Sequence, residues 1–292
     1  MKNTASLVDA NTPLATALKV EDAAVVKVNR DTLSTLILAT TAGVFIGLAF
    51  IFYIVVTAGG NVLPYGLNKL IGGLCFSLGL MLVVILGGEL FTSTVLTITA
   101  RASKRITTQA LLKNWGLVYL GNFIGAMLLV GIMIMAKHYE GAHGLLGLGY
   151  MQTAQAKLQH TFGQAFALGI MCNIMVCLAV WMAYAGRTVV DKLLAVILPV
   201  AMFVAAGFEH CIANMFLIPM AIITKHVAPS EFWANAGIAP SQFADLTWSQ
   251  FLLNNLVPVT LGNIVGGAIF VGLTYWFVYR RPQLNSANND NQ

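Results

Sequence analysis

The fold of this chain is decided by residues 70–100, which read LIGGLCFSLGLMLVVILGGELFTSTVLTITA. The only charged side chain in this stretch is Glu89. A straight α-helix over the stretch would be about 46 Å long at 1.5 Å per residue, whereas the hydrocarbon core of a bilayer is about 30 Å thick. The sequence therefore predicts a membrane segment with a break or a re-entrant loop. Gly87 and Gly88 supply the flexibility, and the hydroxyls of residues 92–94 can cap the helix after it.

The composition extends this prediction to the whole chain. Of its 292 residues, 58% are hydrophobic and only 9% are charged, whereas about 25% of the residues in a soluble domain are charged. The long apolar runs are continuous, which favours helices over the alternating strands of a membrane barrel. We therefore predict an all-α membrane protein with six transmembrane segments, near residues 33–57, 66–100, 111–136, 160–186, 192–224 and 251–279.

The basic residues predict how these segments are oriented. With the N-terminus in the cytoplasm, twelve of the 16 Lys and Arg residues fall on the inner side. Such an excess of basic residues is typical of cytoplasmic loops, so both termini are predicted to be cytoplasmic. The excess also explains the net charge of +5 without a nucleic-acid partner. The outer side carries the four remaining basic residues, Lys69, Lys137, Lys157 and Lys225.

The two ends of the chain lie outside the predicted six-span membrane domain, residues 31–281. Residues 1–30 form a cytoplasmic N-terminal segment with two open interpretations. One is a solvated tail, and the other is an amphipathic helix near the membrane. The Asn-rich residues 282–292 are predicted to be a disordered cytoplasmic tail. The face of the N-terminal helix would consist of Leu7, Leu14, Leu18, Val25 and Val28.

A repeat relates the two halves of the chain. The tripeptide LGN at 120–122 is followed by glycines at 125 and 131, and LGN at 261–263 is followed by glycines at 266 and 272. The same offset of 141 residues aligns Asn114 with Asn255. Each repeat, about 31–137 and about 158–281, contains three spans, so the two must insert with opposite orientation. Inverted repeats place a substrate path along their shared axis, near the midplane.

Polar residues gather in the second and fifth spans, where GGE at 87–89 is matched by GFE at 207–209. We predict that both spans are broken there. Each half-helix after a break begins in mid-membrane with a partial positive charge and free N–H groups. Two such N-termini facing one centre suit a small anion and repel cations. His210 is the only histidine well inside a predicted span, and it either lies on the anion path or is a structural hydrogen-bond partner.

The other polar residues of the spans have two open roles as well. Glu89 and Glu209 either accept hydrogen bonds from the N–H groups of the broken loops, which we favour, or carry protons. Asn122 and Asn263 occupy equivalent repeat positions, which favours tying helices together. Further uncharged donors that can line a pore or tie helices are Thr92, Asn173 and Asn214.

The sequence favours neither an enzyme nor a metalloprotein. The four cysteines lie in predicted spans without CxxC spacing, so we interpret them as packing residues. The chain contains no GxSxG, HExxH or P-loop pattern. We therefore expect no enzymatic activity, no metal and no cofactor.

Four motifs stand out in the spans, namely GELFTS at 88–93, LPVAMFV at 198–204, GFEHCIANM at 207–215 and GNIVGG at 262–267. They resemble the formate–nitrite transporter family, and within it the formate channels. The resemblance extends from about Val28 to Arg281. It implies an aquaporin-like protomer that assembles as a homopentamer in a bacterial cytoplasmic (inner) membrane, with one pore for formate and related small anions in each protomer.

The resemblance also implies roles for individual residues. His210 faces the central chamber and exchanges a proton with the anion, and Thr92 is its hydrogen-bonding counterpart in the gating loop. Lys157 attracts anions near the outer entrance, and Asn173 lies close to the pore. Asn214 and Asn263 fix His210 and the loops. The implied cytoplasmic constriction consists of Phe76, Leu80 and Phe203, and the periplasmic one of Leu90, Phe91 and Val176.

These residues suggest how an anion crosses an apolar neck. A small monocarboxylic acid with a pKa near that of Asp, about 3.9, is ionised at neutral pH, and a bare anion is costly in a dry neck. We expect the helix N-termini and His210 to stabilise the anion, and transient protonation to let it pass as the neutral acid. Pores of this kind recognise size and charge, so a nitrite or hydrosulfide channel of the same fold is the alternative.

Overall fold

The computed structural model describes residues 9–59 and 63–289, and every regular element in these ranges is helical. The α-helices and the 3₁₀ and π segments (η) are α1 (Pro13–Val28), α2 (Thr32–Thr57), α3 (Tyr65–Leu86), α4 (Phe91–Thr94), η2 (Val95–Thr97), α5 (Ile98–Ala102), α6 (Thr108–Met135), η3 (His138–Glu140), α7 (Leu145–Leu158), α8 (Phe162–Ala185), α9 (Val189–Ala205), α10 (Cys211–Val227), α11 (Ser230–Ala236), η4 (Pro240–Phe243), η5 (Gln250–Leu256), α12 (Val257–Ile264), η6 (Val265–Leu273), η7 (Trp276–Arg280) and α13 (Arg281–Asn289).

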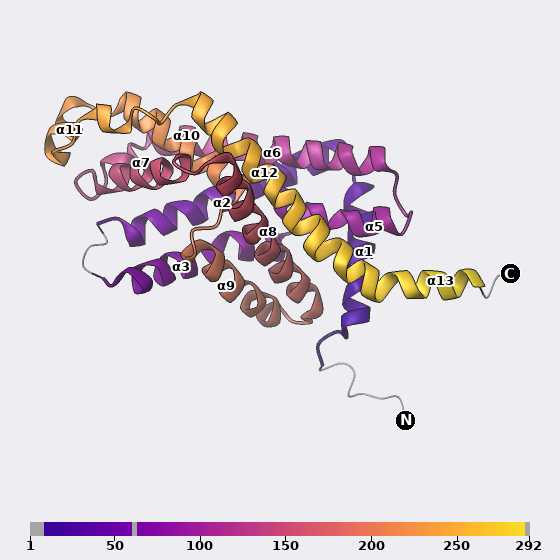
Figure 1. Ribbon diagram of the computed structural model, residues 1–292. Coiled ribbons are helices and arrows are strands. Elements are labelled where there is room, and N and C mark those ends of the chain that lie inside the picture. Colours follow the sequence, from indigo (N-terminus) through magenta and orange to yellow (C-terminus); the bar gives the residue numbers. More distant parts are fainter. Residues whose placement is uncertain (1–8, 60–62, 290–292) are drawn as a thin grey trace.

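The apolar helices form one bundle (Figure 1). Within the described ranges, five helices are long and apolar enough to cross a membrane, namely α2, α3, α6, α8 and the continuous helix Gln250–Ser286. The fifth predicted span is instead divided into α9 and α10, which have 17 residues each. The prediction of an all-α membrane protein with interrupted second and fifth segments is confirmed.

Both interruptions are built in the same way. A glycine with left-handed backbone follows α3 and α9, namely Gly87 at φ 79° and Gly207 at φ 73°. Glycine adopts this conformation without the steric cost that other residues meet, which makes it the common residue after a helix C-terminus. In both loops the N–H of the residue after this glycine donates to the carbonyl five residues before it, from Gly88 to Val83 and from Phe208 to Phe203. The chain leaves each helix at an equivalent point and enters the bundle centre.

The repeated glycines mark equivalent helix crossings. A Cβ atom added at Gly125 of α6 would lie 1.9 Å from the carbonyl oxygen of Thr40 on α2. A Cβ atom added at Gly266 of η6, which continues α12, would lie 2.3 Å from the carbonyl oxygen of Ile170 on α8. Only glycine allows these backbones to approach so closely, as is typical of membrane helix pairs. The crossing of α2 and α6 therefore has its counterpart in the second half.

Helix α1 lies across one end of the bundle, at the end opposite α7 and α11 (Figure 1). Its buried face differs from the one expected from the leucines and valines. Residues 14, 18, 25 and 28 are only partly buried, and residue 7 lies outside the described ranges. The buried residues recur at helical spacing and are mostly small, which lets α1 pack against α5 and α8. They are Thr16, Ala17, Val20, Glu21 and Ala24.

A buried carboxylate fixes α1 to the rest of the molecule. Glu21 accepts hydrogen bonds from Arg280 at 2.8 and 3.2 Å, from Ser103 at 2.7 Å and from Arg105 at 3.1 Å. Burial raises the pKa of the carboxyl group, but these hydrogen bonds outweigh burial and hold the pKa of Glu21 below its ordinary value. The N-terminal helix, the loop after α5 and the end of the last span are thereby joined.

The C-terminal segment also differs from its prediction. Residues 282–292 are predicted to be disordered, whereas Arg281–Asn289 forms helix α13, and residues 290–292 lie outside the described ranges. The physical reason is that α13 continues the last span without interruption. Helix nucleation is the costly step, and a preceding helical turn removes that cost even for a polar sequence.

Candidate functional site

The two interrupted segments meet at His210 and Thr92. His210 is the N-cap of α10, and its Nδ1 accepts a hydrogen bond from the N–H of Ala213 at 3.1 Å. A neutral imidazole with Nδ1 as acceptor carries its proton on Nε2. That Nε2–H points at the Thr92 Oγ1 of the other loop, 3.1 Å away. The hydroxyl proton of Thr92 is then available to a further acceptor.

Two asparagines hold the loops before the half-helices. Asn122 accepts from the N–H of Phe91 at 2.8 Å and donates to the carbonyls of Ala39 and Glu89. Asn263 accepts from the N–H of Cys211 at 2.9 Å and donates to the carbonyls of Gly169 and Glu209. Each asparagine therefore satisfies three buried backbone groups at a site where irregular backbone would be costly. The first N–H of each half-helix is bound by this side chain and does not face an anion.

The carboxylate of Glu209 is fully buried and pairs with Lys157, whose Nζ lies 2.7 Å from Oε1. The amides of Asn214 and Asn255 donate to Oε2 at 2.6 and 3.1 Å, and His160 Nε2 lies 3.9 Å from Oε1. Glu209 was expected to accept from N–H groups of the loop. The carboxylate oxygens of Glu209 instead accept hydrogen bonds from side chains, because Asn263 already holds the backbone of the loop.

Glu89 repeats this arrangement at the other break. Its carboxylate pairs with Lys27 at 2.8 Å and with Arg30, and the hydroxyl of Thr94 donates to it at 3.5 Å. Lys27 comes from α1, so the N-terminal helix contributes to this cluster. As with Glu209, the expected hydrogen bonds from loop N–H groups are replaced by charged side chains, and Asn122 holds the backbone instead.

The two clusters are related by the repeat. Lys27 and Lys157 are 130 residues apart, as are the carbonyl acceptors Ala39 and Gly169. Asn114 donates to the carbonyl of Lys27, and Asn255 donates to the carbonyl of Lys157, both at 3.4 Å. The alignment of Asn114 with Asn255 in the sequence thus corresponds to equivalent contacts. Helix α1 occupies in the first half the place that α7 occupies in the second.

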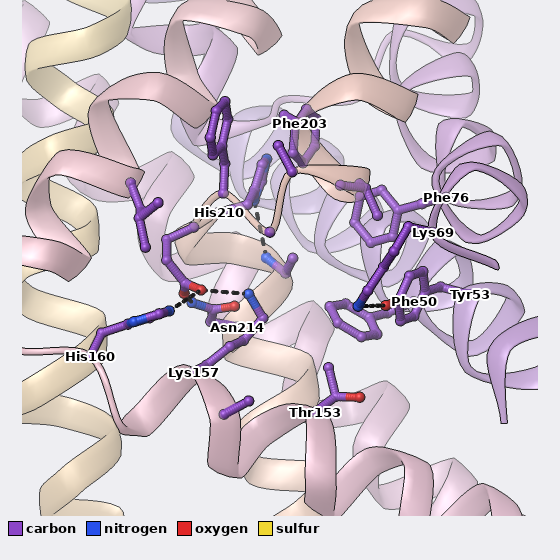
Figure 2. A pocket seen from close by; sticks show the side chains of 18 residues that line it. Phe50, Tyr53, Lys69, Phe76, Thr153, Lys157, His160, Phe203, His210 and Asn214 are labelled. Atoms are coloured by element: carbon purple, nitrogen blue, oxygen red, sulfur yellow. Dashed lines mark hydrogen bonds and ion pairs between the residues drawn. The ribbon is translucent and has the colours of Figure 1, made fainter. Parts of the chain in front are cut away.

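Two cavities lead toward the His210–Thr92 pair from opposite ends. We call them the Lys157 cavity, of about 300 Å³, and the Lys27 cavity, of about 230 Å³. Figure 2 shows the first, with Lys157, His160 and Asn214 on one side and Phe76, Tyr53 and Lys69 on the other. The Lys27 cavity is lined by Lys19, Lys27, Arg30, Val83, Val84, Gly87, Gly88, Glu89, Ser93, Val180, Ala183, Tyr184, Gly186 and Lys192.

An apolar neck lies between the two cavities. It encloses a void of only about 10 Å³, and its single polar side chain is that of His210, which also lines the Lys157 cavity. The ring of Phe203 stacks on the imidazole at 5.9 Å between centroids. An anion in this neck would meet few compensating dipoles, so charge is costly there. The neck is lined by Ile46, Phe76, Leu80, Leu90, Val176, Val200, Phe203 and His210.

The structure corrects the sides implied for the two constrictions. Phe76 and Phe203 were implied on the cytoplasmic side, away from Lys157, but both line the Lys157 cavity. Leu90 and Val176 were implied on the side of Lys157, and they line the neck beyond these rings without lining that cavity. The reason is the chain direction. Phe76 lies in the middle of α3, nearer the Lys157 end than the break that carries Leu90.

Three other predicted pore residues have different surroundings. Leu80 lines the neck. Phe91 packs edge-on against Tyr119 and Trp115, at 4.9 and 6.4 Å between centroids, and lines none of the three spaces described above. Asn173 is buried and donates to the carbonyl of Asn263 at 2.6 Å, and its own Oδ1 has no hydrogen-bond partner in the described part of the chain.

Several residues of the site are not assigned to it by the sequence alone. Lys27, Arg30 and His160 pair with the two buried glutamates, and a repeat search that included the N-terminal segment would have related Lys27 to Lys157. Asn255 was aligned in the repeat but not assigned to the site. Phe50, Tyr53 and Lys69 carry no signal in the sequence, because long apolar helices do not reveal which face lines a cavity.

Comparisons with known proteins agree with this architecture. The family described as "Formate/nitrite transporter" matches residues 14–277. A protein named formate channel FocA from Escherichia coli (strain K12) is 54% identical, with 92% of this chain and 94% of that protein covered. FocA from Haemophilus influenzae is 49% identical, with 90% and 92% covered. A solved structure described as a pentameric formate channel with formate bound has 56% identity and a TM-score of 0.82, and covers 85% of this chain and 97% of that chain.

Proposed function

Because this chain belongs to the formate/nitrite transporter family, we propose that it is a channel for formate and related small monovalent anions, and not an enzyme. The observation that carries the proposal is the His210–Thr92 hydrogen bond, which joins the two interrupted segments at an apolar neck between two cavities that contain cationic side chains. The names of the relatives, formate channels, favour formate among the small anions.

Each part of the path has a physical task. The cationic cavities concentrate anions at both ends of the pore. Thr92 is fully buried and is not among the side chains that line the neck. Its hydroxyl, polarised by the Nε2–H of His210 through the hydrogen bond between them, becomes the proton donor to a carboxylate oxygen that reaches His210. The rings of Phe76 and Phe203 exclude water there, which makes passage of the neutral acid less costly than passage of the anion.

The geometry limits how His210 can take part in proton exchange. Its Nδ1 accepts from the N–H of Ala213, and a protonated Nδ1 cannot accept. An imidazolium would therefore leave the N-terminus of α10 without its cap, at a cost of about 1 kcal/mol. In the arrangement seen here the imidazole is a hydrogen-bond donor to Thr92, and proton exchange with the anion requires the ring to release Ala213.

The assembly and topology belong to this proposal as well. We place the protein in a bacterial cytoplasmic membrane as a homopentamer, in keeping with the pentameric channel that it resembles. The twelve-to-four distribution of basic residues supports cytoplasmic termini. The Lys27 cavity then opens to the cytoplasm and the Lys157 cavity to the periplasm.

We propose the same three parts of the chain as the sequence predicts, except that α1 belongs to the first repeat. Residues 1–30, 31–281 and 282–292 were separated as an N-terminal segment, a six-span channel domain and a tail. The shared contacts of Lys27 and Lys157 support assigning α1 to the first repeat. The first repeat then begins with α1 and the second with α7.

Flux measurements in proteoliposomes test the proposal. Purified protein should carry radiolabelled formate faster than empty liposomes do, and parallel assays with nitrite and hydrosulfide should give lower rates. A preference for nitrite or hydrosulfide would favour the alternative channel of the same fold. Absence of flux for all three anions would reject the proposed function.

A further inference from the structure

The Lys157 cavity contains two lysines in different electrostatic states. Lys157 is paired with the buried carboxylate of Glu209 at 2.7 Å and its side chain is only 14% exposed. At long range this pair acts as a dipole without net charge. Lys69 has no carboxylate within ion-pair distance among the described residues, and it lines the same cavity. Lys69 therefore carries the net positive charge that an approaching anion would sense, although Lys157 was expected to be the attractor.

The ammonium group of Lys69 is positioned by a second polar group. Its Nζ donates to the hydroxyl oxygen of Tyr53 at 3.4 Å and lies 5.6 Å from the centroid of the Tyr65 ring. Figure 2 shows the pair of Lys69 and Tyr53 on the wall that faces Lys157 across the cavity. The tyrosine hydroxyl accepts from the lysine, so its own proton remains available to a ligand.

The fold leaves room for this pair. Tyr53 of α2 lies against Gly72 of α3, where an added Cβ atom would be 2.7 Å from its ring. Gly72 is three residues after Lys69 and hence on the same helical face. The ring of Tyr53 also packs on Phe50 at 5.5 Å between centroids. The hydroxyl is thus held beside the ammonium group by a rigid aromatic ring.

We propose that Lys69 and Tyr53 form a capture site for a small carboxylate in the Lys157 cavity. The site rests on the proposed function for its ligand. Two adjacent donors, an ammonium and a hydroxyl, match the two oxygens of a carboxylate and form charge-assisted hydrogen bonds with it. A captured anion lies in the same cavity as His210 and passes the rings of Phe76 and Phe203 to reach the neck.

Two measurements on the full-length protein, the first in membrane vesicles and the second after purification, test the capture site. The first is formate uptake into right-side-out membrane vesicles, measured against formate concentration at low and high salt. The second is saturation-transfer NMR of isotope-labelled formate, which reads binding without transport. The variants are Lys69→Met, Lys69→Gln, Lys69→Arg and Tyr53→Phe. Lys137→Met is the matched control, since Lys137 is 66% exposed and does not line the described cavities. Size-exclusion chromatography checks the assembly of each variant.

Loss of the charge should raise the formate concentration for half-maximal uptake about threefold to tenfold at low salt, with a smaller effect at high salt. Lys69→Gln should behave like Lys69→Met, and Lys69→Arg should restore the wild-type value. Tyr53→Phe should weaken binding about twofold to fivefold without changing the salt dependence. Lys137→Met should match the wild type.

The outcomes separate this inference from the proposed function. If the wild type carries formate but Lys69→Met and Lys69→Gln behave like Lys137→Met in both measurements, the capture site is wrong and the channel function stands. If the wild type carries no formate, the channel function fails. In that case the NMR measurement alone tests the capture site. A saturation-transfer signal that is present in the wild type and lost in Lys69→Met supports the site, and equal signals in the two proteins overturn it.

Discussion

At the scale of single residues, His210 has two tasks on its two ring nitrogens. Nδ1 caps α10 through Ala213, and Nε2 joins the other interrupted segment through Thr92. The structural and the functional interpretations of this histidine are therefore not exclusive. The hydrogen bond at Nδ1 contributes to stability, and the hydrogen bond at Nε2 sets the polar group that an anion contacts at the neck.

Substitution of His210 should separate these tasks. His210→Asn retains a good N-cap acceptor for α10 but loses the donor to Thr92, whereas His210→Phe loses both. We expect His210→Phe to destabilise the protein by about 1 kcal/mol relative to His210→Asn, measured by thermal unfolding. Both variants should alter the pH dependence of formate flux, measured in proteoliposomes from neutral to acidic pH. A His210→Asn protein with a wild-type pH profile would show that the imidazole does not govern flux.

At the scale of elements, the helix pairs α2–α6 and α8–α12 are set by close backbone contact at glycines. Gly125 and Gly266 lie where a Cβ atom would overlap a carbonyl oxygen of the neighbouring helix. These crossings position Asn122 and Asn263, each one turn before its glycine. The asparagines then reach the loops that carry Glu89 and Glu209. Helix packing thus determines the geometry of the interruptions.

A pair of alanine substitutions on α6 tests this packing. Alanine is the better helix former by about 1 kcal/mol, and at Gly131, where no atom lies within 4 Å of an added Cβ, that gain should dominate. At Gly125 the overlap of 1.9 Å with the Thr40 oxygen should dominate and cost about 1 to 3 kcal/mol net. Thermal unfolding should rank Gly131→Ala at or above wild type and Gly125→Ala below it. Equal stability of the two variants would contradict the role of the crossing.

At the scale of the whole molecule, Glu21 connects α1 to the bundle. Lys27 lies in the last turn of this helix and Arg30 follows its C-terminus, so the position of α1 decides whether they reach Glu89. The Lys27 cavity is complete only when α1 is docked. The N-terminal helix is therefore a structural part of the pore and not a separate appendage.

Docking of α1 should depend on pH through Glu21. Because its pKa is lowered in the folded protein, the stabilisation is fully present above the ordinary value of 4.5 and is lost as the pH falls through the lower folded value. We expect the protection factors of the α1 amides, which compare each exchange rate with the intrinsic rate at the same pH, to be high at neutral pH and to fall only in strong acid. Glu21→Gln should show fast exchange already at neutral pH.

Asp22→Asn is the matched control for that experiment. Asp22 also pairs with Arg105, at 2.6 Å, but its side chain is 62% exposed, and exposed ion pairs contribute little. Slow exchange in Asp22→Asn together with fast exchange in Glu21→Gln is expected. The opposite ranking would mean that Glu21 does not hold the helix.

Hydropathy and residue spacing alone predict the six apolar segments, the two interruptions, the repeat and the charge asymmetry. These features are visible without the fold, since hydropathy and the Gly-x-Glu pattern act within one segment, and the repeat and the charge asymmetry are comparisons along the chain. The packing of the helices determines which cavity Phe76 and Phe203 line, the pairing of Lys157 with Glu209, and the position of Lys69 beside Tyr53. The physical reason is that these contacts join helices distant in sequence. In an apolar helix every face is hydrophobic, so periodicity does not show which face turns to the pore.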